Sequence, residues 1–177
     1  FGLAAAGIGS DTGGSVRIPA AWNDLVGFKT TSGRIPLDGV VELCPRFDTI
    51  GPLCRTVEDA ALVTALMENT AAPDLRGAPL KGRRFAILDT VVFDDIRPEP
   101  RAAFEAAVEK LKAAGAVIDK ITAPEVAEAL GASGVLYAGE AYGVCRDVIE
   151  EAPEKMFDEI RERFRSGQGY SAPDILA

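Results

Sequence analysis

The sequence predicts an α/β fold on two observations. Strand-like apolar runs alternate with helix-like segments, most clearly over residues 85–88, 98–114 and 117–121. This strand–helix–strand order implies a parallel pair of strands joined by a right-handed crossover. Hydrophobic residues also make up 47% of the 177 residues, which is enough for one domain with a packed core.

The first part of the chain predicts short elements separated by loops. Residues 3–9 predict a buried strand, residues 15–21 begin a helix that tolerates Pro19 only within its first turn, and residues 25–30 predict another buried strand. Residues 31–47 are rich in glycine, proline and charge. They predict a long loop with strand pieces, as active-site surroundings often have.

A capped helix is predicted from Thr56 to about Asn69. Thr56 suits the N-cap position, and acidic residues follow it in the first turn. The apolar residues of this helix recur at helical spacing and predict a face that packs in the core. They are Ala60, Val63, Leu66 and Met67.

The second part of the chain is predominantly helical. Residues 98–114 form the strongest helix pattern, with Gly115 in the position after its C-terminus. Further helices are predicted over residues 126–130, 136–150 and 155–165.

Ser171, Pro173 and Asp174 then form a helix-start pattern. The chain stops soon after this signal and begins within an apolar segment. We therefore expect residues 1–177 to be one partial domain, an internal piece of a longer protein.

The candidate for chemistry is the stretch from Gly9 to Ala20. It contains Thr12, Gly13, Gly14 and Ser15 in succession. Paired glycines let the backbone turn sharply with its amides free, and a serine at that corner can act as a nucleophile beside an oxyanion hole. The same triplet also occurs in ordinary turns.

Two nucleotide-binding patterns fit this stretch poorly. No Gly-Lys-Ser/Thr follows the glycines, so the stretch is not a Walker loop. Thr12 also stands where the third glycine of a dinucleotide fingerprint would be. A phosphate cradle over residues 7–15 stays a rival interpretation.

The chain contains no histidine. Within these residues this excludes Ser-His-Asp triads, Cys-His dyads and imidazole metal sites, so a nucleophilic serine needs another base, such as lysine. The three cysteines are few and widely spaced, which predicts neither a disulfide framework nor a zinc site. We expect no metal and no cofactor. We also expect the cysteines to be buried or unreactive thiols in a reducing cytoplasm.

Charge and hydropathy exclude two classes of partner. The formal net charge of −8 argues against a nucleic-acid-binding surface. No apolar run approaches the roughly 20 residues of a membrane-spanning helix, which argues against a membrane partner.

Several ordered blocks resemble the amidase signature family. The densest match is Gly9-Ser10-Asp11-Thr12-Gly13-Gly14-Ser15-Val16-Arg17-Ile18-Pro19-Ala20-Ala21, within a dense region from Gly7 to about Leu66. Further blocks are Val26-Gly27-Phe28-Lys29-Thr30, Asp48-Thr49-Ile50-Gly51-Pro52-Leu53 and Arg55-Thr56-Val57-Glu58-Asp59-Ala60-Ala61, with a looser match at Gly139-Glu140-Ala141-Tyr142.

The resemblance implies a Ser–cis-Ser–Lys triad that cleaves amide bonds. It implies that Ser15 is the nucleophile and that the amides of Thr12, Gly13, Gly14 and Ser15 form the oxyanion hole. In the family the cis-serine and the lysine lie upstream of this block, and Lys29 matches a structural lysine. The implied fold is an α/β/α sandwich around a mixed sheet.

Other polar and aromatic residues have structural interpretations beside the functional ones. We expect Asp11 to accept backbone hydrogen bonds in its turn and Arg17 to pair with an acidic group, although Arg17 could meet a substrate carboxylate. Asp48 could line the pocket or cap its loop. Trp22 and Phe28 are predicted to pack in the core.

The resemblance implies hydrolysis of a linear carboxamide through a serine acyl-enzyme, most like stand-alone bacterial amidases. The sequence carries Asn23-Asp24 and Thr30 where many members have Cys-Gly and proline, and residues 36–47 look unlike the tRNA-dependent transamidating protein. The A subunit of the glutamyl-tRNA(Gln) amidotransferase nevertheless stays an alternative, as does a non-catalytic nucleotide-binding α/β module. We expect a small amide substrate and a cytoplasmic location, and a homodimer stays an open alternative to a monomer.

Overall fold

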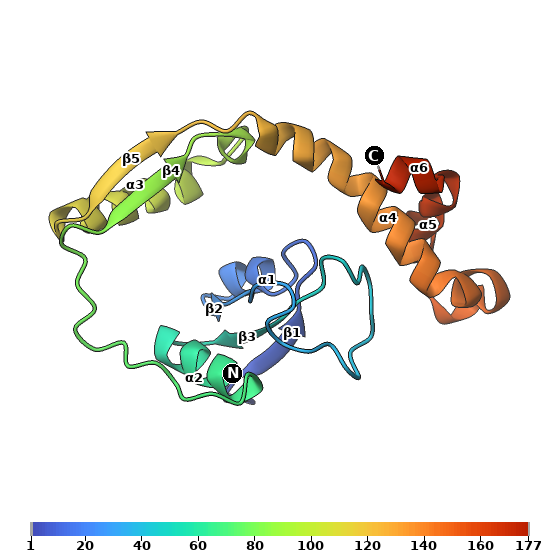
Figure 1. The fold of residues 1–177 in the computed structure, drawn as a ribbon, viewed down its shortest axis with the longest axis horizontal. Helices are drawn as coiled ribbons and strands as arrows, with labels where there is room; N and C mark the ends of the chain where they lie inside the picture. The colour runs from blue at the N-terminus through green and yellow to red at the C-terminus, as the bar shows by residue number, and fades with distance from the viewer. Residues whose placement is uncertain (1, 177) are drawn as a thin grey trace. The chain divides into compact units, whose positions relative to one another are not determined.

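The computed structural model describes residues 2–176, which form two compact units (Figure 1). The first unit comprises residues 2–75 and 135–176, and the second comprises residues 76–134. Each unit contains helices and one small sheet, the first antiparallel and the second parallel. The predicted α/β class is therefore confirmed, with two small sheets among the described residues.

The sheet of the first unit has the strand order β1-β3-β2. β1 (Gly7–Ser10) and β2 (Val26–Gly27) each pair antiparallel with β3 (Ile50–Cys54). β3 is central and almost entirely buried. β3 was not predicted from the sequence, because its Gly51-Pro52 pair is typical of a turn rather than of a central strand.

The two flanking strands are shorter than the sequence predicts. The prediction of a buried strand over residues 3–9 is wrong at its start, because pairing with β3 begins at Gly7 and Leu3 is 93% exposed. It is also wrong about burial, because β1 is largely exposed and its Ile8 is 65% exposed. β2 ends at Gly27, after which the Phe28 amide and the Thr30 hydroxyl donate to the carbonyls of Pro52 and Ile50. The described residues 31–47 contain no strand, so the predicted strand pieces are absent.

α2 (Val57–Met67) begins as predicted, since the Thr56 hydroxyl accepts a hydrogen bond from the Asp59 amide at 3.0 Å. Its predicted core face is confirmed at Ala60 and wrong at Leu66. Ala60, Thr64 and Ala65 are the buried residues, whereas Leu66 is 68% exposed. Small side chains four residues apart let α2 approach β3 closely, and Leu66 lies off that stripe.

α1 (Arg17–Trp22) starts two residues later than predicted and buries Ala20. Trp22 is its last residue and is 82% exposed, and Phe28 is 44% exposed. The prediction that these two aromatic residues pack in the core is therefore wrong for the described chain, where α1 covers β2 with the small Ala20 side chain instead.

The C-terminal helices are α4 (Glu125–Glu151), α5 (Asp158–Arg165) and α6 (Ala172–Leu176). The two helices predicted over residues 126–130 and 136–150 are one continuous helix. Gly131 and Gly134 stay helical within it, because a glycine costs a helix only about 1 kcal/mol and no proline is present. α6 begins at the predicted cap, where Ser171 and Asp174 exchange hydrogen bonds. No helix within residues 2–176 has both the length and the apolarity to cross a membrane.

The second unit has the predicted strand–helix–strand order. β4 (Arg84–Leu88) and β5 (Val117–Ile121) pair in parallel, with α3 (Pro98–Ala113) between them in sequence. Gly115 follows α3 with a φ of +86°, and its amide donates to the Lys112 carbonyl at 2.8 Å. The predicted helix end is confirmed; the hand of the crossover stays a prediction.

We expect Gly51→Ala to lower the free energy of unfolding by at least about 3 kcal/mol, because a Cβ atom there would overlap the Phe28 carbonyl oxygen. Gly7→Ala, in the paired strand β1, is the matched control, because its Cβ would lie 3.9 Å from the nearest Leu53 atom. Urea denaturation of both variants measures the difference. Equal stabilities would contradict the close approach of Phe28 to β3.

Candidate active site

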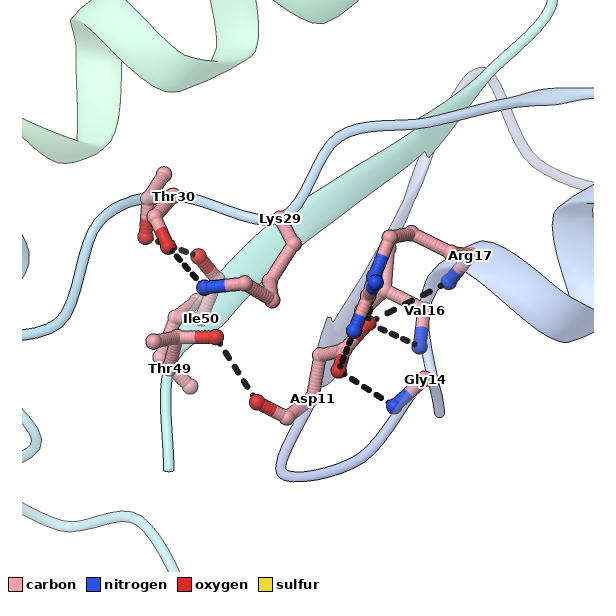
Figure 2. A network of polar contacts seen from close by, with 8 residues as sticks. All are labelled: Asp11, Gly14, Val16, Arg17, Lys29, Thr30, Thr49 and Ile50. Atoms are coloured by element: carbon pink, nitrogen blue, oxygen red, sulfur yellow. Dashed lines mark hydrogen bonds and ion pairs between the residues drawn. The ribbon is translucent and has the colours of Figure 1, made fainter. Parts of the chain in front are cut away.

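The loop after β1 is folded around the carboxylate of Asp11. This side chain is fully buried and accepts hydrogen bonds from the backbone amides of Gly14 at 2.6 Å, Val16 at 3.1 Å and Arg17 at 3.3 Å (Figure 2). The predicted role of Asp11 as an acceptor of backbone hydrogen bonds is confirmed. One buried carboxylate thus fixes the path of residues 12–17.

The Arg17 side chain completes this arrangement. Its Nε donates to one carboxylate oxygen of Asp11 and its terminal nitrogen to the other, both at 3.0 Å. Burial by itself raises the pKa of Asp11, but the hydrogen bonds from Arg17, Val16 and Gly14 outweigh burial and lower that pKa to about 2. The expected pairing of Arg17 with an acidic group is confirmed, and Asp11 is ionised at neutral pH.

The backbone of Asp11 extends the ladder between β1 and β3. Its amide donates to the Thr49 carbonyl at 2.8 Å, and its carbonyl accepts from the Thr49 amide at 3.2 Å and the Thr49 hydroxyl at 2.8 Å (Figure 2). The loop therefore starts from a residue that is held by the central strand of the sheet.

A second buried carboxylate, that of Asp48, holds Thr12. The Thr12 hydroxyl donates to one oxygen of Asp48, whose other oxygen accepts from the amides of Leu43 at 2.8 Å and Cys44 at 3.0 Å. Of the two roles considered for Asp48, the structure shows loop capping. The predicted oxyanion loop is therefore tied to residues more than 30 positions away in sequence.

Gly14 occupies a backbone conformation that other residues rarely adopt. Its φ is +132°, and a Cβ atom there would lie 2.7 Å from Cδ1 of Ile18. Its carbonyl accepts from the Ile18 amide at 2.7 Å, and its amide donates to Asp11. Gly14 thus shapes the turn. The expectation that its amide joins the oxyanion hole is corrected here, because that amide donates to the Asp11 carboxylate.

The amides of Thr12, Gly13 and Ser15 have no hydrogen-bond partner within residues 2–176. Ser15 itself is exposed and lies between Gly14 and the start of α1. The loop therefore combines an accessible serine with three unpaired amides, and acyl-transfer enzymes use groups of both kinds.

This geometry disfavours the nucleotide-binding alternative. The amides of Gly14, Val16 and Arg17 already donate to Asp11 and are therefore not available to a phosphate. A phosphate in their place would face a buried carboxylate, and two like charges in close contact repel strongly.

Within residues 2–176, neither Lys29 nor Cys44 is suited to act as the base for Ser15. The Lys29 amine donates to the Thr30 carbonyl at 2.7 Å (Figure 2). Burial, reinforced by Glu140, raises the pKa of the Cys44 thiol to about 12, so it is a poor nucleophile or base. Within residues 2–176 no group of three or more acidic or cysteine side chains could hold a metal ion.

Residues of α4 reach the same loops, which sequence reasoning missed. Glu140 accepts hydrogen bonds from the Cys44 thiol at 3.0 Å and the Arg46 amide at 3.1 Å, and it pairs with the Arg46 side chain at 2.9 Å. The Tyr137 ring packs edge-on against Phe47, with ring centres 5.1 Å apart. More than 80 residues separate these partners in sequence, so no local pattern could reveal the contacts.

A cavity of about 350 Å³ lies in the same unit but apart from Ser15. Its largely apolar lining includes Val26, Phe28 and Ala61, and Arg34 and Glu68 form an ion pair beside it. Ser15 and its neighbours do not line this cavity. It is therefore a separate feature from the loop described above.

The chain is similar to several known proteins. The chain is 36% identical to 2-amino-5-chloromuconic acid deaminase of Comamonas testosteroni, over 99% of this chain and 39% of that protein. It is 40% identical to the A subunit of the glutamyl-tRNA(Gln) amidotransferase of an Exiguobacterium species, over 76% of this chain and 31% of that protein. A crystal structure of an amidase superimposes with a TM-score of 0.85 at 31% identity, covering 97% of this chain and 38% of that one.

The chain thus spans about two fifths or less of the length of these relatives. Residues 1–171 match the family described as Amidase, which is nearly the whole of the chain. Its blocks, its fold and its relatives therefore agree, and the chain belongs to the amidase family.

Proposed function

We propose that this chain supplies the nucleophile and the oxyanion-binding loop of an enzyme that hydrolyses a linear carboxamide. The observation that carries the proposal is the exposed Ser15 hydroxyl beside the unpaired amides of Thr12, Gly13 and Ser15. Membership of the amidase family supports hydrolysis of a C–N bond.

In the proposed reaction the Ser15 oxygen bonds to the amide carbon, and the carbonyl oxygen takes up the electron pair. The unpaired amides stabilise that oxyanion. The electron pair then returns, the C–N bond breaks, and the proton taken from Ser15 leaves with ammonia or an amine. Water attacks the acyl-enzyme in the same way and releases the acid.

The base is proposed from the family resemblance. It implies a lysine acting through a cis-serine, and we propose that residues outside 1–177 supply both. Three facts support this: the chain has no histidine, the Lys29 amine is engaged by Thr30, and the relatives are more than twice as long. On the same grounds we propose that the two units belong to one larger amidase domain.

A second candidate function is that of the A subunit of the glutamyl-tRNA(Gln) amidotransferase. The protein of that name from Exiguobacterium is 40% identical to this chain over 147 residues. A protein with this role would pass ammonia to a partner rather than release it. Free ammonia from simple amides, measured with the full-length protein alone, would favour the stand-alone amidase.

We expect a fluorophosphonate to add one label to the full-length enzyme, and Ser15→Ala to abolish both labelling and amide hydrolysis. The reason is that Ser15, within residues 2–176, lies exposed in the loop whose Thr12, Gly13 and Ser15 amides are unpaired. Ser10→Ala, at the end of β1, is the matched control and should label normally. Mass spectrometry locates the label. A label on Ser10 would refute the assignment.

Asp11→Asn should reduce hydrolysis at least about 100-fold, because the loop loses the charge that gathers its amides. It should also lower stability by about 2 kcal/mol at pH 6, since lowering the pKa from 3.8 to about 2 favours the folded state. Steady-state kinetics and urea denaturation measure the two losses.

The lowered pKa of Asp11 also predicts how the stability difference between wild type and Asp11→Asn depends on pH. The stabilisation is present above pH 3.8, where the unfolded carboxyl is ionised, and is lost as pH falls through the folded pKa of about 2. The stability gap between wild type and Asp11→Asn should therefore shrink by about 2 kcal/mol between pH 5 and pH 2. A gap that is constant over this range would contradict an ionised, hydrogen-bonded Asp11.

Dialysis against a chelator should leave hydrolysis unchanged. In the proposed mechanism backbone amides, rather than a Lewis acid, hold the oxyanion. Ammonia release before and after dialysis is the measurement. Activity that disappears and returns with added zinc or manganese would overturn the mechanism.

A further inference from the structure

An aromatic side chain of α4 borders the loop that carries Ser15. A Cβ atom added to Gly13 would lie 3.6 Å from Cε2, 3.8 Å from the hydroxyl oxygen and 3.9 Å from Cζ of Tyr137. The hydroxyl-bearing edge of the Tyr137 ring therefore faces the backbone of Gly13, one of the residues with an unpaired amide. A side chain at position 13 would fill the narrow space between them.

The position of this ring is fixed from two directions. Phe47 contacts it edge-on, at an interplanar angle of 85°. One helical turn further along α4, Glu140 holds the same loop through Cys44 and Arg46. Because Asp48 of that loop also binds Thr12, the ring and the residues that carry the unpaired amides share one support.

The Tyr137 hydroxyl has no hydrogen-bond partner within residues 2–176, and the side chain is only partly exposed. A phenol can both donate and accept a hydrogen bond. An unpaired hydroxyl on an otherwise fixed ring, beside an unpaired amide, can bind a polar group that occupies the same space.

We infer that Tyr137 determines acyl-group specificity: its ring forms one wall of the site, and its hydroxyl hydrogen-bonds a polar atom of the acyl chain. The inference rests on the proposed function. A carbonyl oxygen bound at the Gly13 amide lies about 3 Å from that nitrogen, so the attached groups come within reach of the ring. For a primary amide the leaving ammonia is small, and the acyl chain is the group that extends to Tyr137.

The test compares two fluorophosphonates of equal length, one with an alkyl chain and one with ether oxygens in the chain. Each is used to label Ser15 in the full-length enzyme, and the ratio of the two labelling rate constants is the readout. Tyr137→Phe keeps the ring and removes the hydroxyl, so it should slow the ether probe about fivefold and leave the alkyl probe within twofold. Tyr137→Ala should slow both probes.

Tyr142→Phe is the matched control, because it removes a hydroxyl from a residue of the same helix whose Cβ lies beside Gly167 instead of Gly13. Its ratio should equal that of the wild type. An unchanged ratio in Tyr137→Phe, with Ser15 still labelled, would overturn this inference and leave the proposed function intact. Failure of Ser15 to label in the wild type would overturn both.

Discussion

The ionised carboxylate of Asp11 is the constraint on which the loop depends. A buried charge is unfavourable by several kcal/mol unless hydrogen bonds and an opposite charge compensate it. Asp11 receives three backbone amides and two Arg17 nitrogens, all from the six residues that follow it. The requirement to satisfy one carboxylate therefore dictates the path of the chain from β1 into α1.

The rest of the first unit fixes this loop in space. β3 holds the backbone of Asp11 through Thr49, and Asp48, the residue before Thr49, holds the Thr12 hydroxyl. The adjacent residues Asp48 and Thr49 thus hold Thr12 and Asp11 in place. Glu140 of α4 binds the neighbouring loop at Cys44 and Arg46, so a helix distant in sequence supports the same region. Loops supported in this way keep the precise geometry that function needs.

Local signals explain which parts of the fold the sequence could predict. The Thr56 cap, the Gly115 helix end and the parallel pairing of β4 with β5 follow from residues close to each element. β3 was missed because Gly51-Pro52 is typical of a turn, and a glycine is needed there only because the Phe28 backbone approaches closely. The exposure of Trp22 was missed because it depends on which residues pack against α1. In the site, the role of Asp11 was predictable because its partners are near in sequence. The contact of Asp48 with Thr12 and the contacts of Tyr137 and Glu140 are tertiary and were not.

The pattern of amides around Asp11 has a consequence for catalysis. The amides of Gly14 and Val16 donate to the carboxylate, while those of Thr12, Gly13 and Ser15 stay unpaired. An oxyanion is stabilised best by donors that are held in place before the reaction begins, because reorienting free dipoles would cost free energy in the transition state. The engaged amides of Gly14 and Val16 flank Ser15, so the bonds to Asp11 restrict the backbone on both sides of it. In the proposed mechanism, a carboxylate that does not contact the substrate thereby sets the orientation of the groups that do.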